Sequence, residues 1–281
     1  MVKHIAIGLD GSAHAANAER IALDLAKRLH GVVHGIHVVD ATFLEGAFIT
    51  DISGAMGFEP FLNLQAQMRA TLDDVAAMIR SDFATRCEAA GVEGQFHLER
   101  AGVVHGLLAA GKLADLLVVG QRGVNSRFHE DLLGSAAEML LRRSSLPVLI
   151  VPLQAESSLR PLAAYDGSPK AVRALQQAAE MSRALSVPLA VVTVEQHEER
   201  ARARLDEASR YLAPYEVEVS YQLRHGEEIE RELLAMLGPE GFDLVFLGAH
   251  GHSRIVELAL GSTSQYVARR APVPVWCVTR A

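Results

Sequence analysis

A glycine-rich segment near the end of the chain has the residue types and spacing of a phosphate-binding loop. It follows the pattern G-x2-G-x9-G-S-T, formed by Gly248, Gly251, Gly261, Ser262 and Thr263. Glycines let backbone N–H groups approach an anion without interference from a Cβ atom. Gly261 and Ser262 would open the next helix, whose free N–H groups and dipole favour negative charge. The pattern predicts a polyphosphate site; alternatively, these glycines only form turns and the serine only caps a helix.

Other side chains near this segment could also contact a phosphate compound. His250 and His252 lie inside the loop and could donate to phosphate, or they could simply be exposed. Asp166 ends an apolar run and precedes Gly-Ser, and Asp10 does the same near the start of the chain. A carboxylate there can accept from a ribose hydroxyl or a base amine, or can hold Mg²⁺ directly or through water. An aspartate that only closes a turn and caps a helix is the alternative.

The chain contains the same series of motifs twice. Three blocks recur in the same order. The first pair is GLDGSAHAANAERIALDLAKRL and AYDGSPKAVRALQQAAEMSRAL, and the second pair is LADLLVVGQRG and GFDLVFLGAHG. The third pair is LLGSAAEMLLRRSSLPVLIVP and ALGSTSQYVARRAPVPVWCVT. Asp10 matches Asp166, Gly120 matches Gly248, and Pro147 matches Pro274. Matched blocks in the same order indicate a duplication. We therefore predict a first copy over residues 1–153 and a second copy over residues 160–281, joined by a polar segment near residues 153–159.

The first copy differs from the second in two respects. Its loop reads Gly120, Gln121, Arg122, Gly123 and then, after ten residues, Gly134-Ser135-Ala136, which is one residue longer. Arg122 could contact phosphate or be solvated. The first copy also carries an insertion at about residues 41–70, which holds four of the nine phenylalanines. The insertion is either a loop and longer helix that cover one sheet face, or an apolar patch for a partner or for self-association.

Strands and helices alternate in each copy. In the first copy the expected strands are residues 4–9, 32–39, 94–100, 115–120 and 147–152, which are mostly continuous apolar runs. Such runs are typical of parallel strands covered on both faces. Ser12 and Ser168 occupy helix N-cap positions. The alternation predicts the α/β class, with an open, five-stranded parallel sheet flanked by helices in each copy.

Composition excludes several classes of protein. A net charge of −7 and a pI near 5.9 argue against a nucleic-acid groove. No apolar run is long enough to span a membrane or to form a signal peptide, so we expect a cytoplasmic protein. Two cysteines cannot form a disulfide framework and are expected to be packed thiols. The sequence lacks the lysine-containing P-loop, the dinucleotide G-x-G-x-x-G after the first strand, and the G-x-S-x-G elbow of α/β-hydrolases.

Asp-Gly-Ser after the first strand, Gly-x2-Gly after the fourth, and Gly-Ser at the last helix together resemble the universal stress protein family. The resemblance covers both copies, and the G-x2-G-x9-G-[ST] pattern is that family's ATP-binding signature. It implies two tandem Rossmann-like domains, each with strand order 3-2-1-4-5. It also implies adenine beside the first-strand aspartate and near Val39 and Val194, with ribose and phosphates on the glycine loop. Family dimers pair through their last strands, so PVLIVP and PVWCVT could pair within this chain and leave other surfaces for a homodimer.

These features predict a regulator or adaptor of the stress response that binds ATP, with Mg²⁺, in the second copy and possibly in the first. An unidentified protein partner would recognise the ATP-bound protein. No catalytic residue is expected. Two alternatives remain: a slow ATPase or self-phosphorylating protein that uses Ser262 or Thr263, and a nucleotide-free scaffold that uses the Phe-rich insertion.

Overall fold

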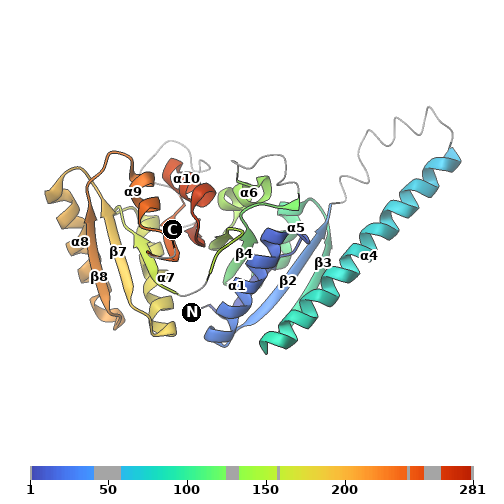
Figure 1. The fold of residues 1–281 in the computed structure, drawn as a ribbon, viewed down its shortest axis with the longest axis horizontal. Coiled ribbons are helices and arrows are strands. Elements are labelled where there is room, and N and C mark those ends of the chain that lie inside the picture. The colour runs from blue at the N-terminus through green and yellow to red at the C-terminus, as the bar shows by residue number, and fades with distance from the viewer. Residues whose placement is uncertain are drawn as a thin grey trace.

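The computed structural model describes residues 2–40, 58–124, 133–156, 159–238, 241–249 and 261–279. Within these residues the strands form one continuous sheet in the order β3-β2-β1-β4-β5-β10-β9-β6-β7-β8 (Figure 1). The strands are β1 (His4–Gly8), β2 (Val32–Val39), β3 (Gly94–Arg100), β4 (Leu116–Gly120), β5 (Val148–Val151), β6 (Pro161–Ala164), β7 (Leu189–Val194), β8 (Val219–Arg224), β9 (Leu244–Gly248) and β10 (Val275–Val278). Each copy thus has the order 3-2-1-4-5, as the family resemblance implied.

The two copies meet at the centre of this sheet. Strands within a copy are parallel, whereas β5 and β10 pair antiparallel, with Val275 opposite Ile150 and Cys277 opposite Val148. Both strands are fully buried, so the contact between the copies is part of the core. The expected pairing of the two last strands is present, and it relates the copies by a pseudo-twofold axis.

Helices cover both faces of the sheet, which explains the continuous apolar strands. The helices are α1 (Ala13–Leu29), α4 (Phe58–Ala90), α5 (Val103–Ala110), α6 (Ser135–Arg143), α7 (Pro169–Leu185), α8 (Glu198–Leu212), α9 (Ile229–Ala235) and α10 (Ser262–Arg270). Helices α1, α4, α7 and α8 pack on one face, and α5, α6, α9 and α10 on the other. The predicted α/β fold with a Rossmann-like arrangement in each copy is therefore confirmed.

Two serines fix the starts of the corresponding helices α1 and α7. The hydroxyl of Ser12 accepts a hydrogen bond from the backbone N–H of Ala15 at 3.1 Å. The hydroxyl of Ser168 accepts in the same way from Ala171 at 3.2 Å. Both helices thus begin where the sequence placed their N-caps, because a hydroxyl here satisfies an N–H that has no intrahelical acceptor.

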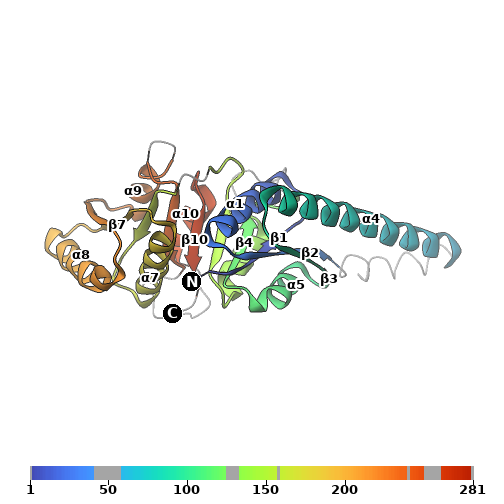
Figure 2. The ribbon, with the colours of Figure 1, turned by 90° about the horizontal axis from the view of Figure 1, so that it is seen from below.

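Helix α4 accounts for part of the insertion in the first copy. Its C-terminal part packs on the sheet through Ala76, Ile79, Phe83 and Cys87, whereas its N-terminal part extends beyond the sheet (Figures 1 and 2). Residues 41–57 lie outside the described residues, so the hypothesis of an apolar contact surface in the insertion stays a prediction. None of the helices among the described residues is long and apolar enough to cross a bilayer.

Both cysteines are packed thiols, as expected. Cys87 and Cys277 are buried and make no disulfide. Burial raises the pKa of Cys87 to about 11 and that of Cys277 to about 12. The thiolate is the reactive form of cysteine, so these raised pKa values disfavour a nucleophilic role for either residue.

Candidate functional site

The second copy has a cavity of about 450 Å³ at the carboxyl ends of its strands. It lies beside β6, where the chain order of the sheet reverses between β9 and β7. Open α/β sheets bind ligands at such a crevice. The residues that line the cavity include Ala164, Asp166, Ser168, Val192, Val194, Glu195, Arg204, Leu233, Gly248, Gly261, Ser262 and Thr263. The structure thus brings together the described residues predicted for the second site.

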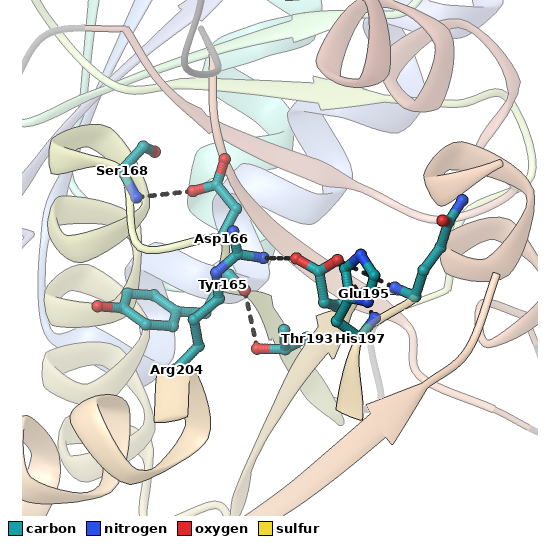
Figure 3. Close-up of polar contacts among 8 residues, drawn as sticks. Tyr165, Asp166, Ser168, Thr193, Glu195, His197 and Arg204 are labelled. Carbon is teal, nitrogen blue, oxygen red and sulfur yellow. Dashed lines mark hydrogen bonds and ion pairs between the residues drawn. The ribbon is translucent and has the colours of Figure 1, made fainter. Parts of the chain in front are cut away.

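Asp166 contributes both to the turn after β6 and to the cavity wall. Its Oδ1 accepts a hydrogen bond from the backbone N–H of Ser168 at 2.9 Å (Figure 3). This bond closes the Asp-Gly-Ser turn, in which Gly167 has a φ of +81°. Because the same carboxylate lines the cavity, the turn holds it in a fixed place beside any ligand. The turn-closing interpretation and the ligand-binding interpretation of this residue are therefore compatible.

The start of helix α10 forms one end of the cavity. The hydroxyl of Ser264 donates to the carbonyl oxygen of Gly248 at 2.7 Å, and the N–H of Gly261 donates to the carbonyl oxygen of Ala249 at 3.0 Å. These bonds hold the first turn of α10 against the end of β9. The first N–H groups of a helix have no intrahelical acceptor, so this end of the cavity favours an anion. His250, Gly251 and His252 of the predicted loop lie outside the described residues.

Gly248 is required for the packing of β9 against α7, whereas the motif suggests that it lets backbone N–H groups approach an anion. A Cβ atom at this position would lie 2.9 Å from the backbone nitrogen of Ala171 and 2.9 Å from the carbonyl carbon of Lys170. The same holds for Gly120, where a Cβ would lie 2.8 Å from the carbonyl carbon of His14. The first glycine of each motif therefore makes room for the first turn of α7 or α1, and this packing holds the end of β9 or β4 beside that turn.

The opposite end of the cavity carries an ion pair. Arg204 reaches from α8 toward Glu195, beside Asp166, with 2.8 Å between Nη1 and Oε2 (Figure 3). The pKa of Glu195 lies below its ordinary value, because the N–H of His197 and the cation of Arg204 outweigh the opposing effect of burial. Tyr165 is buried nearby, and its burial together with the Glu207 carboxylate raises its pKa to about 12. This end of the cavity thus carries two opposite charges that hold each other in place and neutralise each other.

The corresponding residues of the first copy are arranged differently. Oδ1 of Asp10 accepts from the N–H of Ser12 at 2.9 Å, as in the second copy, but Oδ2 also accepts from the N–H of Val124 at 3.1 Å. A Cβ at Gly123 would lie only 2.9 Å from this Oδ2 atom. The start of the glycine loop in the first copy, at Gly123 and Val124, thus contacts the aspartate of the same copy directly.

Gly134, Ser135 and Val39 are further residues predicted for the site of the first copy. Gly134 packs on the loop: its N–H donates to the carbonyl oxygen of Gln121 at 2.9 Å, and a Cβ there would lie 3.2 Å from the Cα of Arg122. Ser135 is exposed at the start of α6, and Val39 is buried at the end of β2. The N–H of Val124 thus occupies the second carboxylate oxygen of Asp10, and the ligand-binding roles expected for Gly134, Ser135 and Val39 stay predictions.

A family model agrees with this repeated geometry. The model described as the universal stress protein family matches residues 1–152 and again residues 160–279. The chain belongs to the universal stress protein family. A relative named "Universal stress protein Slr1230", from Synechocystis sp. (strain ATCC 27184 / PCC 6803 / Kazusa), is 29% identical over 286 residues, covering 98% of this chain and 99% of the relative.

Solved structures of universal stress proteins also match this chain. One from Archaeoglobus fulgidus DSM 4304 is 24% identical, with a TM-score of 0.72, and the match covers 99% of this chain and 98% of the other. A universal stress protein solved in complex with cAMP is 24% identical and matches 44% of this chain and 98% of its own, with a TM-score of 0.38. The full-length match shows that the tandem arrangement occurs elsewhere in the family.

Magnesium is the metal expected at the aspartates of this universal stress protein. Both predicted ligands, Asp166 and Asp10, already accept backbone hydrogen bonds, as described above. Across the part of the chain that the structure describes, no group of three or more His, Cys, Asp or Glu side chains could hold a metal ion. Since Mg²⁺ commonly takes one or two carboxylates together with water and substrate phosphates, an ion here would need most of its oxygen ligands from a nucleotide and from water.

Glu195 and Arg204 also line the cavity, and the motifs of the universal stress protein family did not reveal them. They come from the end of β7 and from the middle of α8, outside every matched block. A signal for Arg204 exists in the repeat, because aligning α8 with α4 places an arginine where the first copy has Ile79. A second hollow, of about 300 Å³, lies between the copies near Asp115 and Trp276; none of the predicted site residues lines it.

Proposed function

We propose that the second copy binds ATP, together with Mg²⁺, and that the protein is a regulator or adaptor of the stress response. The observation that carries the proposal is the cavity at the carboxyl ends of β6, β7 and β9, with the first turn of α10 at one end. Its volume of about 450 Å³ is within the range of small-molecule sites, about 300–1,000 Å³.

The phosphates would lie at the α10 end. Ser262 and Thr263 line the cavity there, and they supply both backbone N–H groups and hydroxyls. A helix N-terminus favours negative charge, and glycine at position 261 keeps the approach clear of side-chain atoms. His250, Gly251 and His252 are proposed to complete the phosphate site.

The nucleoside would lie toward β6 and β7. Val192 and Val194 offer apolar contacts for a base, and the Asp166 carboxylate can accept from a ribose hydroxyl or a base amine. Mg²⁺ would be held by the phosphates, with water or Asp166 completing its ligands.

A regulatory role needs only that ATP binds one conformation better than another. Helix α10 contacts the nucleotide at its N-terminus and the first copy at its C-terminus, where Gln121 binds the carbonyl oxygens of Ala268 and Arg269. ATP binding would therefore affect the contact between the two copies as well as the cavity.

A pair of matched substitutions tests this proposal. Thr263→Glu places a carboxylate at the start of α10, where it suits the helix dipole but repels phosphate. Ala136→Glu makes the same change at the corresponding position of α6 in the first copy, and both positions are half-buried. Native mass spectrometry with MgATP should show one nucleotide on the wild type and on Ala136→Glu, and none on Thr263→Glu.

Thermal unfolding supplies an independent readout. Binding to the folded state alone should raise the melting temperature of the wild type in MgATP, since a ligand at about 100 times its Kd adds about 2.7 kcal/mol. No shift and no bound nucleotide in the wild type would refute the proposal. Loss of binding in Ala136→Glu alone would place the nucleotide in the first copy.

A further inference from the structure

The two copies differ at one position that faces the proposed base end of the cavity. In α4 the residues Ala76, Phe83 and Cys87 are buried, seven and then four residues apart. Ala201, Ala208 and Leu212 of α8 are buried at the same spacing. Both helices precede the third strand of their copy, so the two sets correspond. This alignment places Arg204 where the first copy has Ile79.

The geometry of both copies confirms this correspondence. A Cβ atom at Gly11 would lie 3.8 Å from Cδ1 of Ile79, and a Cβ atom at Gly167 would lie 3.9 Å from Nε of Arg204. Each side chain therefore lies over the glycine of its own Asp-Gly-Ser turn. One is an apolar side chain that is 8% exposed, and the other is a guanidinium that lines the cavity.

The fold does not require a cation at this position. Isoleucine fills the same place in the first copy, where it belongs to the core. In the second copy the ion pair is only partly removed from water, because the side chains of Arg204 and Glu195 are 28% and 15% exposed. Ion pairs in such surroundings stabilise a fold no better than apolar residues do. Because both side chains line the cavity, the pair lies where it can take part in binding.

We infer that Arg204 contacts the planar base of the ligand and determines how tightly the second copy holds it. This inference rests on the proposed nucleotide site. A guanidinium is flat and stacks on aromatic rings, which an ammonium or an alkyl group does less well. Glu195 holds the group in position at 2.8 Å before the ligand arrives, so little side-chain freedom is lost on binding. Ile79 provides no such contact in the first copy.

Arg204→Ile is the decisive variant, because it installs the residue that the first copy already accommodates. Arg202→Ile is the matched control: it removes the same charge from the same helix, at an exposed arginine paired with Glu198 and absent from the cavity lining. The Kd values of ATP and AMP should be measured by calorimetry for both variants and the wild type. AMP carries the base but lacks the β- and γ-phosphates.

We expect Arg204→Ile to weaken ATP and AMP by the same factor, about three- to tenfold, as a cation–π contact of this kind would give. Arg202→Ile should bind both as the wild type does. If Arg204→Ile unfolds, Arg204→Met, which keeps the unbranched stem, serves in its place with the same expectation.

Two results would overturn the inference. Unchanged ATP affinity in Arg204→Ile would show that the guanidinium makes no contact that matters. Weakened ATP binding with unchanged AMP binding would place Arg204 at the distal phosphates. In both cases the wild type still binds ATP, so the proposed function stands. If the wild type binds neither ATP nor AMP, the proposed function and this inference are refuted together.

Discussion

The side-chain amide of Gln121 crosses between the copies and donates to the backbone carbonyl oxygen of Ala268, with 2.9 Å between Nε2 and O. The same amide lies 3.0 Å from the carbonyl oxygen of Arg269. These carbonyls belong to the last turn of α10, where no intrahelical donor is available. In the second copy Ala249 occupies the position that corresponds to Gln121, so this contact is not repeated by the pseudo-twofold axis.

Gln121→Ala should destabilise the contact between the copies. Gln121 is 6% exposed, so its loss leaves the buried carbonyl oxygen of Ala268 and the partly buried one of Arg269 without this donor. We expect the free energy of unfolding to fall by about 1–3 kcal/mol. Denaturant unfolding measures this, and Gln95→Ala, at an exposed position on β3, should change it by less than about 0.5 kcal/mol. Equal stability of the two variants would contradict the assignment.

Gly248→Ala should disturb the packing of α7 on β9. A methyl group would meet the backbone of Lys170 and Ala171 at 2.9 Å, and neither of these atoms can rotate away. The expected loss is about 1–3 kcal/mol of unfolding free energy, as for other overpacked sites. Gly102→Ala is the control, because nothing lies within 4 Å of a Cβ there and its φ is −61°. A drop in the control of the same size would point to backbone effects instead.

Arg86→Met should destabilise the first copy by leaving a buried carboxylate without its cation. Glu19 is fully buried and its Oε1 lies 2.8 Å from Nε of Arg86. Breaking a fully buried pair costs about 3–5 kcal/mol, and the 44% exposed Arg86 side chain reduces our expectation to about 2 kcal/mol. The double variant Glu19→Gln/Arg86→Met should recover most of this loss in denaturant unfolding at pH 7.

The single variant Arg86→Met should also change how the free energy of unfolding depends on pH. Burial raises the pKa of Glu19 above 4.5 in the folded protein, and Arg86 opposes the shift. A raised carboxyl pKa gives a contribution to stability that is complete below the unfolded pKa and is lost as the pH rises through the folded pKa. Without Arg86 the folded pKa rises further. The stability of Arg86→Met relative to wild type should therefore fall as the pH rises beyond the folded pKa of Glu19 in the wild type, and a difference that does not change with pH would refute this.

Three histidine side chains that lie in a row should make the protein less stable in mild acid. His34 lies between His4 and His97, with ring nitrogens 3.1 Å and 3.4 Å apart. Burial, and then the neighbouring His97 and His4, lower the pKa of His34, although Glu93 opposes the shift. Its contribution to stability is therefore complete above the unfolded pKa of 6.5 and is lost as the pH falls through the lower folded pKa.

The measurement is the free energy of unfolding between pH 7 and pH 5. His34→Gln should lose less stability over this interval than the wild type, because it removes the group that must take up a proton against its surroundings. His225→Gln, at an exposed position after β8, should follow the wild-type curve. If His34→Gln also follows that curve, the row of histidines does not govern the acid response.

The sequence alone determined the fold of this protein to a large extent. Ser12 and Ser168 act as N-caps because capping depends on a residue and the next three along the chain, which a local pattern contains. The parallel strands could be located because burial on both faces leaves continuous apolar runs. The duplication was visible as matched blocks, and the pairing of β5 with β10 followed from the family resemblance rather than from local pattern.

Only the tertiary structure decided which side chains meet. Arg204 faces Glu195, Gln121 reaches Ala268, and Gly248 lies under the first turn of α7. Each contact depends on the rotation of a helix about its axis and on its distance from the sheet. These are set by the packing of the whole core, so no stretch of sequence contains them. For the same reason the motifs located the end of the cavity that would hold phosphates but did not reveal the ion pair at the other end.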